Sequence, residues 1–95
     1  MLVAQGDGPA ALQAFRKSLA IREALAARDP ANAGAQMDLA VSHSKLGTAQ
    51  TVPTKEQRQH LSEGLRILEA MAAGGRLMPN QDYRDWFRQR LSEIE

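Results

Sequence analysis

Apolar residues recur every three or four positions from Pro9 to Pro30, which predicts one long helix that ends before the proline. Two apolar stripes lie side by side along it. The first stripe holds Leu12, Phe15, Leu19 and Ala26, and the second holds Ala11, Ala14, Ser18, Ile21 and Leu25. Together they form an apolar face wider than a surface helix needs. We therefore expect this helix to have partners on two sides.

Three further segments of the chain show helical spacing. Residues 33 to about 50 follow Asn32, which can serve as their N-cap. Residues 54 to 73 begin with Thr54 and Gln57, the spacing of a capping box, and stop at a pair of glycines. A last helix can be capped by Asn80. Its apolar residues are Tyr83, Trp86, Phe87, Leu91 and Ile94.

The first residues and the composition complete the fold prediction. Residues 1 to 5 have the pattern of the last turn of another helix, because Gly6-Asp7-Gly8 then supplies turn residues. Good helix formers are abundant, whereas β-branched and aromatic residues are few. At 95 residues the chain has the length of one domain. We predict an all-α fold in which about four helices pack as antiparallel hairpins.

An internal repeat links two of these helices. A shift of about 46 residues places Ser18–Ala27 over Gly64–Ala73, and six of the ten positions are then identical. Phe15 falls on Leu61, and Leu25 falls on Met71. The repeat reproduces both apolar stripes. It therefore predicts that the first and third of the four helices have equivalent places in the fold.

These residues resemble the tetratricopeptide repeat family, in its long-helix bacterial form that is similar to kinesin-light-chain repeats. The pattern from Gln5-Gly6-Asp7 to Ile21 resembles the end of a first repeat helix and the body of a second. Leu46-Gly47 resembles the Leu-Gly pair of the next first helix, and Asp29-Pro30 resembles the proline that closes a repeat. The resemblance implies an α-solenoid fragment that binds proteins.

The resemblance also divides the single predicted domain, residues 1–95. Residues 1–30 would be a partial first repeat, residues 31–75 a second repeat, and residues 76–95 a C-terminal capping helix. The sequence departs from the family at three places. His43 stands where the family often has tryptophan, residues 51–54 replace the usual glycine turn, and Arg58 stands where the first copy has Leu12.

Charge and cysteine content limit the classes of partner. The net charge is +1 with acids and bases interspersed, so no extended field favours nucleic acid or an acidic membrane surface. Without cysteine there is no disulfide framework and no thiolate metal site. The N-terminal residues are too weakly apolar for a signal peptide or a membrane span. We expect a cytoplasmic protein that binds neither nucleic acid nor membrane.

No residue pattern predicts catalysis, a metal or a cofactor. His43 and His60 share no local ligand spacing, and a metal site needs three or four donors. We interpret His43 as a packed helix residue and His60 as an exposed partner of Glu56, four residues before it. Ser42, His43 and Ser44 are adjacent along a helix, so their side chains diverge. We therefore expect no enzymatic activity.

The last helix offers two weaker interpretations. Arg84, Arg88 and Arg90 could form an anion-binding surface, but acidic residues alternate with them, which favours a solvated face of mixed charge. Tyr83 and Trp86 could anchor a partner, because aromatic residues dominate such sites. The alternative is that they cover the open end of the core.

The resemblance implies where a peptide would bind. Tetratricopeptide domains hold extended peptides in a concave groove lined by the first helix of each repeat. The matching positions are Val41, Ser44, Lys45 and Thr48. The family's clamp for a C-terminal carboxylate needs several basic and amide residues, and only Lys45 qualifies here. We therefore do not predict that clamp.

We expect a non-enzymatic protein–protein interaction module whose partner is a protein or peptide. The structural alternative is a capping fragment of a longer solenoid, or a self-associating half-domain without a peptide ligand. Solenoid repeats contact only their neighbours, so an apolar face without a neighbour needs a cover. We predict a homodimer that uses Leu12, Phe15 and Leu19 of the first long helix.

Overall fold

The computed structural model describes residues 8–94, and within that range it contains helices and no strand. The elements are α1 (Gly8–Arg28), α2 (Ala33–Thr48), α3 (Thr54–Ala73), the short 3-10 helix η1 (Pro79–Gln81) and α4 (Arg84–Glu93). The all-α prediction is confirmed, with four α-helices. The helical turn expected in residues 1–5 lies outside the described residues.

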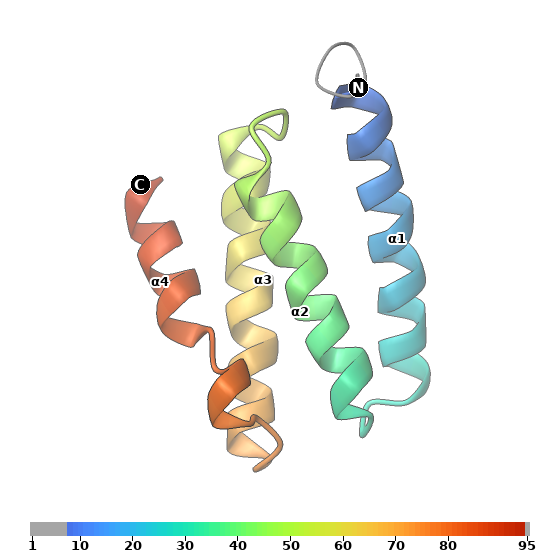
Figure 1. Cartoon of the computed structure of the whole chain (residues 1–95), viewed down its shortest axis with the longest axis vertical. Coiled ribbons are helices and arrows are strands. Elements are labelled where there is room, and N and C mark those ends of the chain that lie inside the picture. The colour runs from blue at the N-terminus through green and yellow to red at the C-terminus, as the bar shows by residue number, and fades with distance from the viewer. Residues whose placement is uncertain (1–7, 95) are drawn as a thin grey trace.

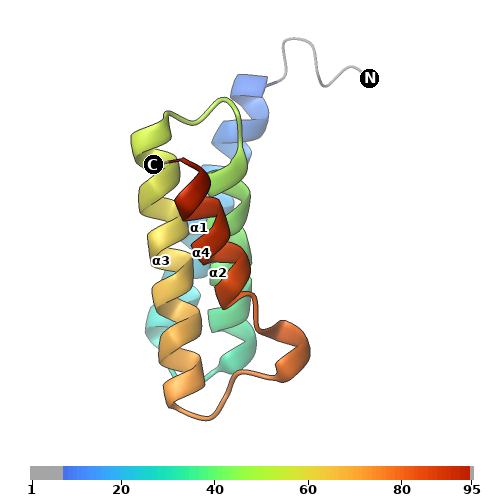
Figure 2. The same cartoon turned by 90° about the vertical axis from the view of Figure 1, so that its left-hand side faces the viewer.

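The helices lie side by side in the order of the chain. Each packs on the next, α1 on α2, α2 on α3 and α3 on α4, so α1 and α4 stand at opposite ends of the row (Figure 1). Seen from the α4 side, α4 lies in front of the space between α2 and α3 (Figure 2). The three helices α2, α3 and α4 therefore enclose one region, whereas α1 packs on the outer side of α2.

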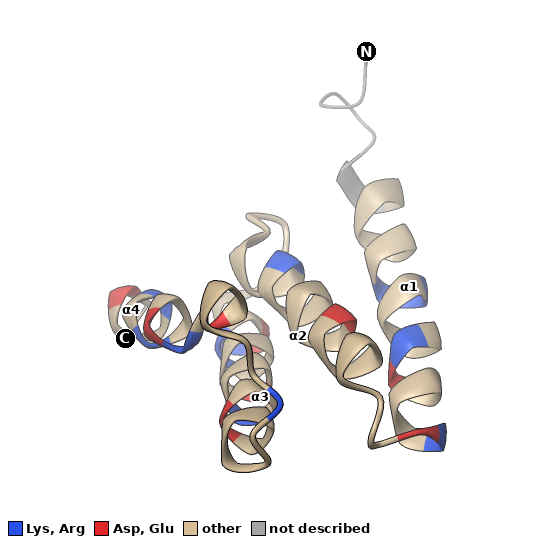
Figure 3. Cartoon of the chain, turned by 60° about the horizontal axis from the view of Figure 1, so that its bottom comes forward, with Lys and Arg blue, Asp and Glu red and all other residues tan. Residues whose placement is uncertain are grey.

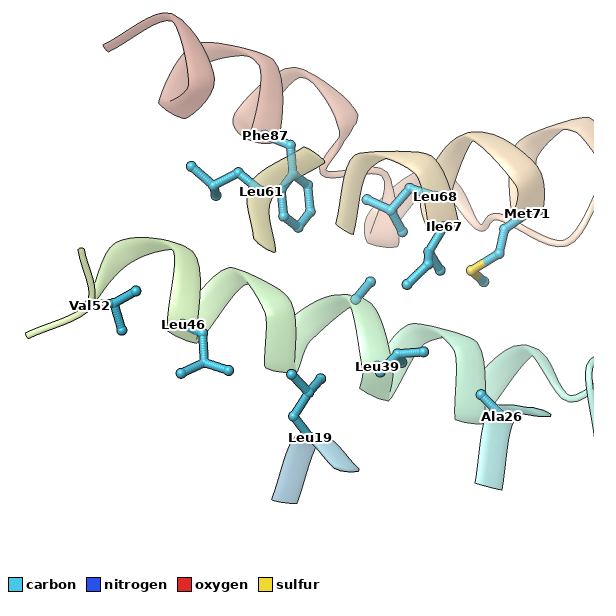
Figure 4. Packing of buried hydrophobic residues seen from close by; sticks show 11 residues of the cluster. Leu19, Ala26, Leu39, Leu46, Val52, Leu61, Ile67, Leu68, Met71 and Phe87 are labelled. Atoms are coloured by element: carbon cyan, nitrogen blue, oxygen red, sulfur yellow. The ribbon is translucent and has the colours of Figure 1, made fainter. Parts of the chain in front are cut away.

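The core lies mainly between α2, α3 and α4. Its largest fully buried side chains are Leu46 of α2, Leu61 and Leu68 of α3, and Phe87 of α4. Ile67 and Met71 extend from α3 toward α2 (Figure 4). By contrast, α1 contributes only Leu19 and Ala26 to the buried set among its described side chains. The core is thus uneven, being full around α3 and thin at α1.

Two glycines allow this core to close. A Cβ atom at Gly47 would lie 2.6 Å from Leu61 Cγ, and a Cβ atom at Gly64 would overlap the ring of Phe87. At each glycine the added Cβ atom would lie closer to the neighbouring side chain than two carbon atoms can approach. Gly47 therefore sets how closely α2 approaches α3, and Gly64 sets how closely α4 approaches it.

The helix caps agree with the sequence at Asn32 and differ from it later. Asn32 accepts a hydrogen bond from the backbone N–H of Ala35 at 3.0 Å, as predicted. The capping box at Thr54 does not form, because Pro53 is the N-cap and the Gln57 amide instead donates to the Ala49 carbonyl at 2.7 Å. That bond fastens the start of α3 to the end of α2.

The turn before α4 also differs from the prediction. Asn80 lies in η1 and does not cap α4. The N-cap is Tyr83, which makes no side-chain cap bond. The carboxylate of the preceding residue, Asp82, accepts a hydrogen bond from the Arg84 backbone N–H at 3.2 Å and another from Arg84 Nε at 2.8 Å. These bonds with Arg84 lower the pKa of Asp82 to about 2. A charged Asp82 suits the positive end of a helix dipole.

Candidate protein-interaction site

An apolar pocket opens between α2 and α4. Its volume is about 300 Å³. It is lined by Met37, Ala40, Val41, Ser44, Tyr83, Trp86 and Phe87. The four residues from α2 stand at positions i, i+3, i+4 and i+7, so they share one side of that helix. The pocket therefore forms where this side of α2 meets the aromatic residues that precede and begin α4.

Aromatic rings make the α4 wall of the pocket. Trp86 and Phe87 meet edge to face, with their ring centroids 5.1 Å apart and their planes at 89°. The Arg90 guanidinium lies 5.6 Å from the centre of the Trp86 ring, within the range of a cation–π contact. Phe87 is buried, whereas Trp86 is half-buried and Tyr83 is exposed. Trp86 and Tyr83 are thus accessible to a partner from the pocket mouth.

The α2 wall offers few polar groups. The Ser44 hydroxyl donates to the Val41 carbonyl at 2.6 Å, so its hydrogen is used within the helix. Met37 is flexible and polarisable, and Val41 is exposed. The chemistry of the pocket is therefore suited to an apolar group.

Two of the four predicted groove residues line this pocket. Val41 and Ser44 lie in its wall, whereas Lys45 and Thr48 are exposed on α2 outside it. The Thr48 hydroxyl donates to the Ser44 carbonyl at 2.9 Å. The groove prediction missed Met37 and Ala40, although their spacing with Val41 and Ser44 was visible in the sequence. It also missed that the aromatic residues of the last helix would face α2.

The predicted self-association residues do not share one exposed surface. Leu19 is only 8% exposed, and Leu12 is half-buried, because both pack in the contact of α1 with α2. Phe15 is 40% exposed, and two residues of the second stripe, Ile21 and Leu25, are 62% and 49% exposed. Leu19 must therefore be removed from the predicted surface. We call Phe15, Ile21 and Leu25 the outer face of α1.

The structure brings the two histidines together, which the sequence did not predict. His43 of α2 and His60 of α3 have their Nδ1 atoms 3.0 Å apart. His60 Nε2 lies 3.3 Å from Glu56 Oε2, so the predicted contact of His60 with Glu56 forms. His60 itself is half-buried, however, and not exposed. His43 is buried, as the interpretation of a packed helix residue required.

Burial and its neighbour change the protonation of His43. Removal from water is the main cause, and the nearby His60 adds to it, so the pKa of His43 falls from about 6.5 to about 4. His43 is therefore neutral at pH 7. Glu63 of α3 opposes the shift, because its charge favours a protonated imidazole.

The arginines of α4 form ion pairs with neighbouring acids. Arg88 contacts Asp85 at 2.9 Å and Glu69 at 3.2 Å, and Arg90 contacts Glu93 at 2.8 Å. Both signs of charge alternate along α3 and α4 in Figure 3. The predicted face of mixed charge is present, and it offers no concentrated positive surface.

From residue 8 to residue 94, no cluster of three or more histidine, aspartate or glutamate side chains is arranged to hold a metal ion. None of the helices in that range is long and apolar enough to cross a membrane.

Comparison with protein families, with curated proteins and with solved structures gives no match to this chain.

Proposed function

We propose that this chain is a non-enzymatic protein-interaction domain of the tetratricopeptide type, which holds an apolar side chain of a peptide in the pocket between α2 and α4. The observation that supports this proposal is the pocket itself, whose aromatic and aliphatic lining includes the exposed Val41 and Tyr83 and the half-buried Trp86. Exposed aromatic residues beside a pocket are typical of binding hot spots.

The size and chemistry of the pocket limit the kind of group that it can bind. A volume of about 300 Å³ lies at the lower limit for sites that enclose a small molecule. It suits one large apolar side chain, such as leucine, methionine or phenylalanine, with the rest of the peptide lying outside. We propose no carboxylate clamp, because Lys45 lies outside the pocket lining.

The hydroxyl groups of Ser42 and Ser44, the two neighbours of His43 along the chain, favour a function other than catalysis. The Ser42 hydroxyl donates to the Asp38 carbonyl at 3.0 Å, and the Ser44 hydroxyl donates to the Val41 carbonyl. Neither hydroxyl is paired with His43, as a serine nucleophile would need to be. We accordingly propose a cytoplasmic domain that acts by binding proteins.

A peptide selection tests the pocket. A displayed random peptide library is selected on the immobilised domain, and the bound peptides are titrated against it while the fluorescence of Trp86 is recorded. Trp86 is the only tryptophan of the chain and lies in the pocket wall, so its emission reports occupancy directly. We expect the selected peptides to share one apolar anchor residue.

A matched pair of variants localises the binding. Val41→Lys places a charge in the pocket wall, and Thr48→Lys places the same charge on α2 outside the pocket. Both sites are exposed, so both variants should fold. We expect Val41→Lys to weaken binding at least about tenfold, equivalent to about 1.4 kcal/mol, and Thr48→Lys to leave it unchanged. Equal binding by both variants would reject the pocket.

The outer face of α1 favours a second candidate function, self-association. Phe15, Ile21 and Leu25 are large apolar residues that are 40%, 62% and 49% exposed. A second copy of the chain could bury both outer faces against each other in a two-fold dimer. The capping-fragment alternative assigns the same face to another helix of a longer solenoid.

Sedimentation equilibrium distinguishes self-association from the pocket function. We expect a monomer–dimer equilibrium that Ile21→Asn and Leu25→Gln weaken at least about tenfold, without loss of helical circular dichroism. Val41→Lys serves as the control. Val41 lines the pocket between α2 and α4, away from the outer face of α1, so this variant should dimerise normally. A monomeric chain at high micromolar concentration would exclude the dimer and leave the pocket proposal intact.

A further inference from the structure

The contact between His43 and His60 joins α2 to α3 and continues to α1. His60 Nε2 faces Glu56 at 3.3 Å, and both oxygens of Glu56 accept hydrogen bonds from Arg16 of α1 at 2.9 Å. The residues Arg16, Glu56, His60 and His43 thus form one chain of polar contacts through three helices. It begins at the surface and ends in the core.

The hydrogen-bond partners in this series of contacts determine which ring nitrogen of each histidine carries a hydrogen. A carboxylate can only accept hydrogen bonds, so His60 Nε2 must carry the hydrogen that it shares with Glu56. In a neutral His60 the Nδ1 atom is then an acceptor. Because His43 Nδ1 lies 3.0 Å from it, His43 must donate from Nδ1. The remaining nitrogen, His43 Nε2, is a bare acceptor.

Within this series of polar contacts, His43 Nε2 is a buried atom without a partner. It makes no hydrogen bond among the described residues. A proton added directly to this nitrogen would produce a buried N–H group without an acceptor. A proton added to His60 Nδ1 has the same result, because His43 must then accept at Nδ1 and carry its hydrogen on Nε2. Both routes place an unpaired donor in the core.

We propose that His43 and His60 form a proton-sensitive contact that holds α2 against α3 while both imidazoles are neutral and opens when the pair takes up one proton. In the closed contact the added N–H has no partner, because His43 Nε2 is buried without one. The pair must therefore separate, or His43 must reach water. Either movement loosens the packing of α2 on α3 near Leu46 and Leu61.

The charged groups around the pair favour this response. From α3, Arg66 disfavours a charged His43, whereas Glu63 favours one. Glu63 is itself paired with Arg66, which reduces its effect on His43. From α1, Arg16 neutralises Glu56, the carboxylate next to His60. Desolvation outweighs Glu63, and the lowered pKa of His43, about 4, agrees with the geometric argument.

Nitrogen NMR of the unmodified chain tests the arrangement without any substitution. The chain has only two histidines, so two imidazole spin systems are expected. At pH 7.5 we expect His43 to carry hydrogen on Nδ1 and His60 to carry hydrogen on Nε2. Identical tautomers, or a His43 that titrates above pH 6 in the folded state, would overturn the proposal.

The dependence of stability on pH tests the opening. A histidine whose pKa is lowered by folding binds its proton more readily in the unfolded chain. Stability is therefore complete above about pH 6.5 and falls as the pH is lowered toward 4. In urea titrations from pH 7 to pH 5, we expect the unfolding equilibrium constant to rise by up to about tenfold per pH unit.

Two variants test whether His43 and His60 cause this dependence of stability on pH. His43→Leu removes the buried imidazole and should flatten the profile between pH 7 and pH 5. Gln59→His adds an exposed histidine on the same helix as His60 and should leave the profile of the parent chain unchanged. A flat profile in the parent chain, or an unaltered slope in His43→Leu, would reject the proton-sensitive contact. Should His43→Leu not fold, the NMR titration decides the question alone.

Discussion

The helices α1 and α3 have similar sequences but different surroundings. Three matched pairs show the contrast in exposed fraction. Phe15 is 40% exposed against 0% for Leu61, Ile21 is 62% against 3% for Ile67, and Leu25 is 49% against 5% for Met71. α3 packs between α2 and α4, whereas α1 packs on α2 and meets α3 at the Arg16–Glu56 ion pair. The repeated pattern therefore specifies how wide the apolar face is, and the neighbours decide how much of it is buried.

The two helices agree on the side that meets the following helix. Gly64 of α3 faces Phe87 of α4, and its equivalent Ser18 is half-buried on α1. Leu19 is buried against α2, and its equivalent Leu65 packs partly against the core. The difference between the copies is thus confined to the other side, where α2 covers α3 and the outer face of α1 has no described cover. Among residues 8–94, α3 has a helix before it to cover this side, and the described part of the chain places none before α1.

The largest expected effect comes from removing the large apolar side chain at the matched position of each helix. Leu61→Ala leaves a cavity between α2 and α3, and we expect a loss of roughly 2 to 5 kcal/mol in the free energy of unfolding. Phe15→Ala removes a side chain that is 40% exposed, so we expect a loss of less than about 2 kcal/mol. Urea denaturation at pH 7.5 measures both.

The concentration dependence of the Phe15 variant makes the test sharper. Under the self-association alternative, the cost of Phe15→Ala should grow with protein concentration, because the dimer stabilises the folded chain. The cost of Leu61→Ala should not grow in that way. If both variants lost the same free energy of unfolding at low protein concentration, Phe15 would be as well buried as Leu61. That result would contradict the difference in burial between α1 and α3.

A smaller effect is expected where the two helices differ by one small residue. Gly64→Ser gives α3 the residue that α1 has, and its Cβ would collide with the Phe87 ring. We expect a loss of about 1 to 3 kcal/mol from overpacking. Ser18→Ala in α1 is the counterpart, and we expect a change within about 0.5 kcal/mol. Thermal unfolding followed by circular dichroism compares the variants.

The same two variants, Gly64→Ser and Ser18→Ala, also test the position of α4. Fluorescence of Trp86 should change in Gly64→Ser, because Phe87 packs against both the glycine and the tryptophan. It should stay unchanged in Ser18→Ala. A stable Gly64→Ser variant with parental Trp86 emission would mean that α4 does not depend on close approach to α3.

The helices were predictable from the sequence because their signals are local. The spacing of apolar residues, the Asn32 cap and the stop at Pro30 all act within a few positions. The Thr54 capping box was wrong because Pro53 occupies the N-cap, which leaves Gln57 free to bond the end of α2. That contact depends on how two helices meet, which local spacing does not describe.

The candidate site was predictable only in part, for the same reason. Val41 and Ser44 were identified from one helix, but the pocket also needs Tyr83, Trp86 and Phe87, which reach it only once α4 has packed on α3. His43 and His60 are 17 residues apart and meet through the pairing of α2 with α3. Leu19 was placed on the surface because the sequence did not show which stripe α2 would cover.

The smallest expected effect concerns the ion pair that links the compared helices directly. Arg16 of α1 contacts Glu56 of α3 at 2.9 Å, with 47% and 31% of the two side chains exposed. Exposed pairs of this kind contribute roughly 0 to 1 kcal/mol. We expect Arg16→Gln to cost about 0.5 kcal/mol at low ionic strength and to lose that effect in about 1 M salt, because salt screens exposed charges. Arg66→Gln, which removes a pair within α3, is the matched control. A salt-independent loss above about 2 kcal/mol for Arg16→Gln would show that this contact, and not the packing of the apolar stripe of α1 against α2, determines how α1 is held.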